Sequence, residues 1–418
     1  MKKLIENLSL SINKYFFPFY RSKEIKLLFE SLEQGKESDK EVAMFVGGCV
    51  RNYLQSNKIN DIDIATILTP LQIKNKLYSS KFRVIETGID HGTVTVEINN
   101  KKFELTTLRQ DLKTDGRHAE IKTIDDWQED SKRRDFTMNA IYLTKKGKIF
   151  DPQLGVNDLK NNIVKFIGDP QTRIKEDFLR IIRFIRFSIQ YNSKIENSTI
   201  QAIKLNLNGI KKLSKERILI ELFKILKLKN FSSIEQNKEL LKIFLLIFPE
   251  FENIKRFQNF KSIKNFSKDP LVFILAVLLI NDKNNHEYFS HKYNVSKNIS
   301  KSLSDLYSIF KEGKNDKEFF KRKLRINLYN YGKENLKKIY LLNLLDKKKI
   351  QSKELLFINE LDKISIPNFP YDGNYLINKG VKEGKKVGLI LHEAEKIWLS
   401  KDFSISRDDF ENIIKKNI

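Results

Sequence analysis

The first 150 residues contain short segments in which hydrophobic and polar residues alternate, a pattern that predicts β-strands. The apolar run "VAMFVGG" (42–48) ends in two glycines and predicts a buried strand followed by a turn. Alternation predicts three further strands in "DIDIAT" (61–66), "GTVTVEIN" (92–99) and "KKFELTTLR" (101–109). The segment "NAIYLTKKGKIFDP" predicts a hairpin that turns at Gly147.

Apolar residues recur at helical spacing in the rest of the chain. Residues 1–38 are expected to be helical, and "KEIKLLFESLEQG" should end its helix at Gly35. After about residue 155 the strand pattern mostly disappears, and segments such as "TRIKEDFLRIIRFIRFSI" and "PLVFILAVLLI" predict helices. The chain is therefore expected to hold a small α+β domain with a mixed sheet and helices, followed by an all-α remainder.

These patterns divide the chain into four expected parts. The α+β part covers 1–150, and three helical parts cover 151–228, 229–364 and 365–418. The last boundary rests on "SIPNFPYDGNYLINKG" (365–380), which interrupts the helical pattern with prolines and glycines.

The net charge of +24 is unevenly distributed along the chain. Residues 1–150 carry 26 basic and 21 acidic side chains, which leaves +19 for the remainder. A long basic region is expected of a protein that binds a polyanion, although a lysine-rich surface exposed to solvent is the alternative.

Two further features of the composition narrow the class of protein. Cys49 is the single cysteine, which excludes an internal disulfide framework and a multi-cysteine zinc site. The single cysteine fits a reducing cytoplasm, so we expect a cytoplasmic protein. No apolar run is long enough to span a membrane, so we expect no membrane partner.

The strongest chemical signal is the pair Asp61 and Asp63, one residue apart on a predicted strand. Residues at i and i+2 of a strand point to the same face, where two carboxylates repel each other unless a cation lies between them. Oxygen ligands of this kind suit Mg²⁺, which is typically bound by one or two carboxylates and by substrate phosphates. The alternative is an ordinary solvated strand face.

Two neighbouring features make a phosphate site more specific than the aspartates alone. Gly47 and Gly48 follow a strand, where glycine lets the backbone approach a phosphate and a following helix directs its N-terminus at the anion. Arg51 falls on the first turn of that helix, and Glu104 supplies a third carboxylate on a later strand. This order of motifs is typical of a nucleotidyltransferase, and the P-loop pattern of kinases is missing from the sequence.

Five segments in succession resemble the motifs of the class II tRNA nucleotidyltransferases (CCA-adding enzymes) and bacterial poly(A) polymerases. They are "GGCVRNYL…DIDIAT", "ELTTLR", "RRDFTMNAIYL", "GDPQTRIKEDFLRIIRF" and "KERILIELFKIL". The resemblance covers about residues 41–228 and implies a nucleotidyltransferase head, a helical neck that recognises the base, an RNA-binding body and a tail. It further implies Mg²⁺ as cofactor, tRNA as partner, and CTP and ATP as substrates.

The resemblance also implies a role for each matching residue. Asp61 and Asp63 match the metal-binding, catalytic aspartates, and Glu104 matches the third catalytic carboxylate. The turn Gly47–Gly48 and Arg51 match the elements that face the nucleotide phosphates.

Further nucleotide contacts are implied beyond the first motif. Arg134 and Asp135 match residues that hold the phosphates and sugar of the nucleotide. Arg183 and Arg186 continue along the helix of Arg180, where contact with nucleotide phosphates and a place on an amphipathic surface are equal alternatives. Asn52 departs from the family, which usually has an acidic residue there, so a salt bridge at that position is in question.

Asp177 and Arg180 match the residues that act as a protein template for the incoming base. Three residues apart, they are expected on one side of a helix. Cytosine and adenine both present an amino donor beside a ring-nitrogen acceptor, which a carboxylate and a guanidinium would satisfy. Uracil and guanine would place a carbonyl against the carboxylate, and an unpaired buried group costs about 1–3 kcal/mol. An ordinary surface ion pair is the alternative.

Members of the family differ in the nucleotides that they add. The polar segment at 111–120 resembles the flexible loop of enzymes that add the complete CCA, which favours template-independent CCA addition with release of pyrophosphate. The alternatives are poly(A) addition or partial (CC or A) addition. A basic RNA-binding protein without catalysis is disfavoured, because it would not need Asp61, Asp63 and Glu104.

Overall fold

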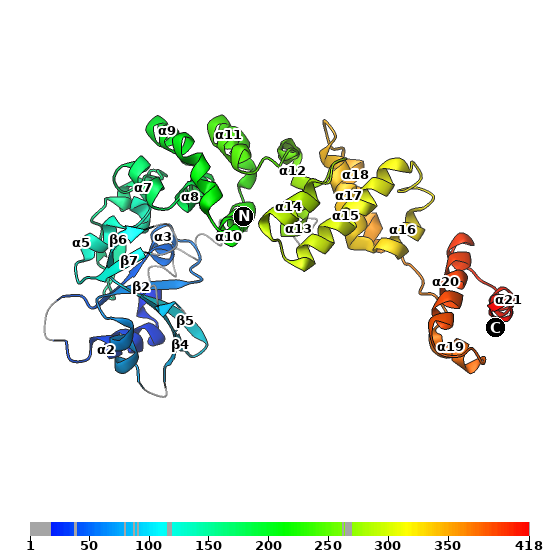
Figure 1. Ribbon diagram of the computed structural model, residues 1–418, viewed down its shortest axis with the longest axis horizontal. Helices are drawn as coiled ribbons and strands as arrows, with labels where there is room; N and C mark the ends of the chain where they lie inside the picture. Colours follow the sequence, from blue (N-terminus) through cyan, green and yellow to red (C-terminus); the bar gives the residue numbers. More distant parts are fainter. Residues whose placement is uncertain are drawn as a thin grey trace. The chain divides into compact units, whose positions relative to one another are not determined.

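The computed structural model describes residues 18–36, 40–78, 81–86, 88–89, 92–114, 119–260, 263 and 270–417. The chain forms two compact units, which comprise residues 1–248 and 249–418 (Figure 1). Within the described residues, no helix is both long and apolar enough to cross a membrane. The expected mixed sheet with helices, followed by a helical remainder, is confirmed.

A seven-stranded mixed sheet forms the framework of the first part of unit 1. Its strand order is β3-β4-β5-β2-β1-β8-β9. The strands are β1 (Ala43–Val46), β2 (Ile62–Thr66), β3 (Arg83–Ile85), β4 (Thr93–Ile98), β5 (Lys101–Thr107), β8 (Tyr142–Leu143) and β9 (Ile149–Phe150). All the strands expected from alternation are present, and β3 is an addition of three residues.

Strand pairing follows the hydrophobic pattern. The central strands β1 and β2 are antiparallel, and β2 is parallel to β5. In β4 every second residue is buried, which places Val94, Val96 and Ile98 on the core side. The hairpin β8–β9 turns where expected, at Gly147, whose φ of 81° is readily adopted by glycine.

Helices of the first part cover the sheet. The elements are η1 (Phe19–Arg21), α2 (Lys23–Glu33), α3 (Gly48–Leu54), α4 (Pro70–Lys76), α5 (Trp127–Lys132) and η3 (Thr137–Asn139). The ring of Phe29 on α2 packs 5.0 Å from that of Phe45 on β1, and both side chains are buried. The predicted helix end at Gly35 lies two residues beyond the observed end of α2, and residues 1–17 lie outside the described residues.

The polar segment after β5 forms a separate two-stranded antiparallel sheet. Strand β6 (Arg109–Thr114) pairs with β7 (Ala119–Thr123), with an irregularity between Asp111 and Lys113. The resemblance indicated a flexible loop at 111–120, whereas the described residues of that segment lie in a hairpin. Residues 115–118 between the strands lie outside the described residues.

The rest of unit 1 is helical. Its elements are α6 (Gly155–Lys160), α7 (Pro170–Glu176), α8 (Leu179–Tyr191), α9 (Asn197–Asn206), η4 (Leu207–Lys212), α10 (Lys215–Leu226), η5 (Phe231–Gln236) and α11 (Lys238–Ile247). Helix α8 is the central element, since ten of its thirteen residues are buried. Phe184 and Phe187 of α8 pack against Phe136, at ring distances of 6.2 and 5.4 Å, so α8 shares one core with the segment that follows α5.

Unit 2 consists of helices throughout its described residues. They are η6 (Ile254–Arg256), α12 (Phe257–Phe260), α13 (Pro270–Leu279), α14 (Asn285–Tyr293), α15 (Lys297–Asn315), α16 (Leu324–Tyr331), α17 (Lys333–Leu345), α18 (Ser352–Lys363), α19 (Gly373–Asn378), α20 (Lys385–Ser400) and α21 (Arg407–Asn417). The central helix α13 is almost wholly apolar and buried. The expected interruption at 365–380 corresponds to the irregular segment before α19 and to α19 itself.

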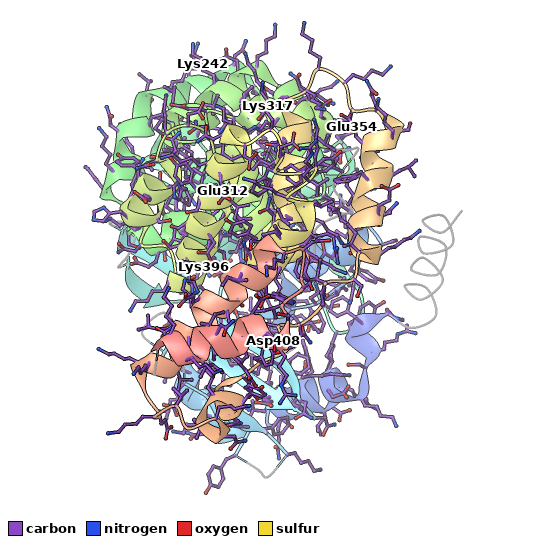
Figure 2. All side chains as sticks on the ribbon, turned by 90° about the vertical axis from the view of Figure 1, so that its right-hand side faces the viewer. Lys242, Glu312, Lys317, Glu354, Lys396 and Asp408 are labelled. Atoms are coloured by element: carbon purple, nitrogen blue, oxygen red, sulfur yellow. The ribbon has the colours of Figure 1, made fainter. Side chains whose placement is uncertain are left out.

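Charged side chains cover the outside of unit 2. Figure 2 labels several of them, among which Glu312, Lys317, Lys396 and Asp408 are exposed. The last three helices have a core of their own, in which the rings of Tyr371 and Phe410 stack 3.8 Å apart.

Candidate active site

The pairing of β2 with β5 brings two of the expected carboxylates side by side. Asp63 and Glu104 are register partners in this parallel pair, and Val46 of β1 lies opposite Asp63 on its other side. Asp63 is partly buried, whereas Glu104 is exposed. Asp61, immediately before β2, is also exposed.

The charges of Asp61, Asp63 and Glu104 influence one another. Burial raises the pKa of Asp63, and the charges of Glu104 and, to a smaller extent, Asp61 add to this effect. Arg134 and Arg51 act in the opposite direction. The described residues contain no group of three or more His, Cys, Asp or Glu side chains arranged as a complete metal site.

The glycine turn packs directly against Asp63. Gly47 has φ 74°, in the region that favours glycine, and α3 begins at Gly48. A Cβ atom at Gly47 would lie 3.3 Å from Oδ2 of Asp63, and one at Gly48 would lie 4.0 Å from the same oxygen. Glycine at position 47 therefore allows both the positive φ of the turn and the close approach of the backbone to the Asp63 carboxylate.

Arg51 connects α3 to η3 and α8. Its Nε donates to the hydroxyl of Tyr191 at 3.2 Å, its Nη1 donates to Oδ1 of Asn139, and its guanidinium lies 5.0 Å from the ring centre of Phe187. Asn52, the departure from the family pattern, donates to the carbonyl oxygen of Lys58 at 3.1 Å. The amide at this position therefore stabilises the local turn.

Arg134 is held by a carboxylate that the sequence analysis did not identify. Nε and Nη2 of Arg134 lie 3.2 and 3.0 Å from Oδ2 of Asp130, and Asp130 is fully buried. Burial alone would raise the pKa of Asp130, but Arg134, Arg133 and the Tyr142 hydroxyl outweigh it and hold the pKa to about 2. In the sequence "WQEDSKRR", Asp130 resembled an ordinary surface charge.

Asp135 is buried and paired with Arg183. Nε and Nη2 of Arg183 lie 2.7 and 2.6 Å from Oδ2 of Asp135, while Oδ1 accepts from the backbone N–H of Phe136 and from Asn139. Burial would raise the pKa of Asp135, but the charge of Arg183 and the Asn139 amide outweigh it and hold the pKa to about 2. The structure thus joins Asp135 and Arg183, two residues that the sequence predicted separately.

Glu221 of α10 extends this charge network. Its carboxylate lies 2.8 Å from Nε of Arg186 and 3.7 Å from Arg183, and the Glu221 side chain is almost fully buried. The guanidinium of Arg186 also lies 4.1 Å from the ring centre of Phe187. The sequence placed Glu221 in a recognisable motif but gave no sign of its partners.

The geometry expected for Asp177 and Arg180 is corrected by the structure. Asp177 is not in the helix of Arg180: it lies between α7 and α8 with an extended backbone (φ −152°, ψ 106°). Its carboxylate accepts from Arg217 at 2.8 Å, whereas Arg180 donates to Glu176 at 2.6 Å. The surface ion pair between Asp177 and Arg180, which was the alternative, is therefore not formed.

Arg180 also joins α8 to the segment that contains Arg134. Its Nη2 donates to the carbonyl oxygen of Arg133 at 3.2 Å, and Arg173 donates to the carbonyl oxygens of Arg133 and Arg134 at 2.6 and 2.7 Å. Arg180, which is expected to read the base, is thus hydrogen-bonded to the backbone next to Arg134, which is expected to bind the phosphates.

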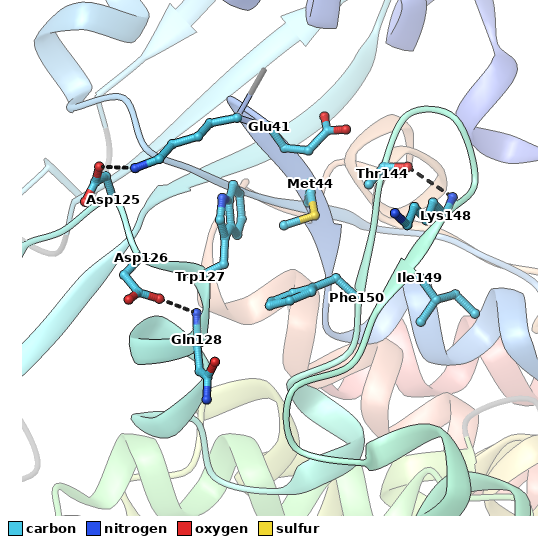
Figure 3. A pocket seen from close by; sticks show the side chains of 11 residues that line it. Glu41, Met44, Asp125, Asp126, Trp127, Gln128, Thr144, Lys148, Ile149 and Phe150 are labelled. Carbon is cyan, nitrogen blue, oxygen red and sulfur yellow. Dashed lines mark hydrogen bonds and ion pairs between the residues drawn. The ribbon is translucent and has the colours of Figure 1, made fainter. Parts of the chain in front are cut away.

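A cavity of about 610 Å³ in unit 1 has none of the predicted site residues in its lining (Figure 3). Met44, Trp127 and Phe150 form its apolar part, and an ion pair between Lys40 and Asp125 lies at its edge. This cavity and the carboxylates Asp61, Asp63 and Glu104 are therefore different places in unit 1.

Two family models match the chain. A model described as "Poly A polymerase head domain" matches residues 43–165, and one described as "Probable RNA and SrmB- binding site of polymerase A" matches residues 193–255. The mitochondrial CCA tRNA nucleotidyltransferase 1 of Mus musculus is 31% identical over 97% of this chain and 95% of its own length. The CCA-adding enzyme of Staphylococcus haemolyticus is 34% identical over 75% of this chain and 74% of its own length.

Solved structures share the fold. The Bacillus stearothermophilus CCA-adding enzyme in complex with CTP matches with a TM-score of 0.70 at 20% identity, over 95% of this chain and 98% of that chain. The Thermotoga maritima CCA-adding enzyme complexed with tRNA matches with a TM-score of 0.64 at 21% identity, over 94% of this chain and 95% of that chain. At this identity the likeness concerns the fold.

Proposed function

Because this chain belongs to the family of class II CCA-adding enzymes and poly(A) polymerases, we propose that it adds C, C and A to the 3′ end of tRNA without a nucleic-acid template. CTP and ATP are the substrates, and each addition releases pyrophosphate. The observation that carries this proposal is the similarity to CCA tRNA nucleotidyltransferases over 97% of the chain. The four-part division into head (1–150), neck (151–228), body (229–364) and tail (365–418) is part of the proposal.

We assign the chemistry to the edge formed by Asp61, Asp63 and Glu104. The donors are all oxygens, and Asp63 is partly buried beside a second negative charge, so the residues fit Mg²⁺ held by Asp61 and Asp63. When bound, Mg²⁺ supplies a lowered pKa for the attacking hydroxyl and charge compensation for the phosphates. Glu104 increases the negative potential that attracts the cation.

The chain's own residues bind and orient the nucleotide. Gly48 and Arg51 would receive phosphate oxygens at the start of α3, and Arg134 would contribute a further guanidinium. Asp135 and Arg183 would act as a pair near the sugar. Since both oxygens of Asp135 already accept hydrogen bonds, a ribose hydroxyl would share an oxygen with an existing donor.

Base selection is assigned to Asp177 and Arg180. Both side chains have charged partners within the protein: Asp177 accepts from Arg217, and Arg180 donates to Glu176. A cytosine or adenine edge would replace these partners with an amino donor for Asp177 and a ring-nitrogen acceptor for Arg180. A uracil carbonyl would instead leave the Asp177 carboxylate without a donor.

The alternatives are poly(A) synthesis and partial addition. A single comparison separates them: purified protein is incubated with a tRNA transcript that lacks CCA, or with an unstructured RNA, and with ATP alone or with ATP and CTP. We expect three additions on the tRNA, with ATP incorporation dependent on prior CTP incorporation. Long tails from ATP alone on the unstructured RNA would establish poly(A) synthesis instead. A cytoplasmic location stays a prediction.

A further inference from the structure

The guanidinium of Arg134, to which the proposed function assigns nucleotide phosphates, rests on a single buried carboxylate. Oδ2 of Asp130 accepts from both Nε and Nη2 of Arg134, at 3.2 and 3.0 Å. The same oxygen accepts from the hydroxyl of Tyr142 at 2.7 Å, and Nε of Arg134 also lies 3.1 Å from that hydroxyl. Three polar groups therefore form a closed triangle of hydrogen bonds.

The second oxygen of Asp130 fixes the surrounding backbone and a second guanidinium. Oδ1 accepts from Nε of Arg133 at 2.7 Å and from the backbone N–H of Arg109 at 3.2 Å. Arg109 is the first residue of β6, so Asp130 connects the base of the β6–β7 hairpin to the segment that carries Arg134. The side chain of Asp130 has no exposed surface, which makes these contacts insensitive to solvent.

This arrangement leaves one edge of Arg134 unused. Nε and Nη2 make the hydrogen bonds, and Nη1 makes none with any part of the chain that the structure describes. Tyr142, whose hydroxyl contacts Arg134, lies opposite Val46 of β1. Val46 in turn lies opposite Asp63 of β2, so the guanidinium lies by the part of the sheet that carries Asp63. Asp130 therefore fixes two nitrogens of Arg134 and leaves the third as a donor for an anion.

We propose that Asp130 is a positioning residue for nucleotide binding, which acts by holding Arg134 in the orientation that receives a phosphate oxygen. An unrestrained arginine samples many rotamers, and fixing it only when the nucleotide binds would cost conformational entropy. A preorganised guanidinium avoids that cost. This inference rests on the proposed function for the role of Arg134, which is the group that touches the substrate.

The competing explanation is that the Asp130–Arg134 pair only stabilises the fold. A double-mutant cycle separates the two explanations, because a residue that acts through Arg134 has no effect once Arg134 is removed. The dissociation constant of CTP is measured by calorimetry with Mg²⁺ for the full-length wild type, Asp130→Asn, Arg134→Ala and the double variant. Thermal unfolding of each variant is recorded alongside.

We expect Asp130→Asn to weaken CTP binding by about tenfold, the scale of one lost hydrogen bond to a charged group. In the Arg134→Ala background the same change should alter CTP binding less than about twofold. The matched control is Asp346→Asn, which breaks the ion pair of Asp346 with Arg256 in unit 2 and should leave CTP binding unchanged. Equal effects of Asp130→Asn in both backgrounds, or no effect in either, would overturn the inference.

A second variant covers the case in which Asp130→Asn does not fold. Tyr142→Phe keeps both charges and removes only the hydroxyl that contacts Asp130 and Arg134, and it enters the same cycle. We expect about threefold weaker CTP binding that disappears in the Arg134→Ala background. An unchanged dissociation constant, or a loss that persists without Arg134, would contradict the inference. Failure of the proposed function would look different: the wild type itself would add no nucleotides to tRNA.

Discussion

The buried carboxylates of unit 1 near the proposed site differ from the exposed ion pairs of unit 2. In unit 1, Asp130, Asp135 and Glu221 are buried, and each forms an ion pair with at least one arginine. In unit 2, ion pairs such as Lys314–Asp282 and Arg325–Asp402 lie on the surface, with acidic partners 71% and 74% exposed.

Buried and exposed charges have different effects on the protein. Buried, multiply bonded carboxylates fix side chains in one orientation, at a high desolvation cost that the partners must offset. Exposed ion pairs contribute about 0–1 kcal/mol each and are weakened by salt. We infer that the buried carboxylates of unit 1 position side chains of the proposed site. The exposed basic side chains of residues 151–418 attract RNA over a longer range.

The largest effect on the rate of nucleotide addition is expected for substitutions of Asp61 and Asp63. Asp63→Ala, and likewise Asp61→Ala, should lower the rate of nucleotide addition by about 1,000-fold or more, because the developing charge loses its compensation. Binding of tRNA should change little, since it depends on many phosphate contacts. Rates are measured in single turnovers and tRNA binding by filter retention. Activity within tenfold of wild type for both variants would remove these aspartates from the mechanism.

The basic part of the chain should make tRNA binding strongly dependent on salt. The region 151–418 carries +19, and log K should fall linearly with log[salt]. Between 50 and 200 mM salt we expect a loss of about 100-fold or more if several phosphates are neutralised. Titrations of labelled tRNA at four salt concentrations measure the slope. A flat dependence would mean that the charge is only a solvated surface.

Acid should destabilise unit 1 through its buried carboxylates. Both Asp130 and Asp135 have a pKa of about 2 in the folded protein, below the ordinary value near 3.9. Their stabilisation is therefore complete above about pH 4 and is lost as the pH falls towards 2, at about 2–3 kcal/mol for each group. Chemical unfolding between pH 2 and 6 tests this, with Asp135→Asn expected to flatten the dependence. An unaltered pH profile in that variant would contradict it.

Asp177→Asn should relax base selection rather than abolish it. An amide can donate as well as accept, so it can face the carbonyl of uracil or the amino group of cytosine. We expect the ratio of kcat/KM for CTP over UTP to fall by about tenfold, on the same tRNA acceptor. Equal losses with both nucleotides would show that Asp177 does not contact the base edge.

The smallest effect is expected for an exposed pair of unit 2. Lys314→Ala removes the contact with Asp282 and should lower the free energy of unfolding by less than about 1 kcal/mol. Denaturant unfolding measures it, and nucleotide addition should stay at the wild-type level. A larger loss would show that the surface ion pairs of unit 2 also make a substantial contribution to the stability of the fold.

Alternation and motif order allowed much of the head to be predicted from sequence. Strands β4 and β5 were recognisable because alternate residues are buried, and β1 because it is an apolar run that is buried throughout. The hairpin β8–β9 was recognisable from its turn at Gly147. The hairpin β6–β7 was not, since "RQDLKT" and "AEIKT" are mostly polar and lack a hydrophobic face. Likewise, β3 has three residues, too few for a periodic pattern.

The site residues were predictable by type but not by partner. No proline or glycine in "KEDFLR" marks the end of α7, so Asp177 was expected inside a helix that in fact begins at Leu179. Asp130 and Glu221 were overlooked as site residues because charged positions on helices usually face solvent, and only the tertiary structure shows that these two are buried.

If this chain builds a defined trinucleotide on tRNA, the sequence of its product will show it. A tRNA transcript ending before CCA is incubated with the protein and all four nucleoside triphosphates, and the 3′ ends are sequenced. We predict that most products end in CCA, with no further extension. Products ending in C or CC alone, or in long runs of A, would contradict the account.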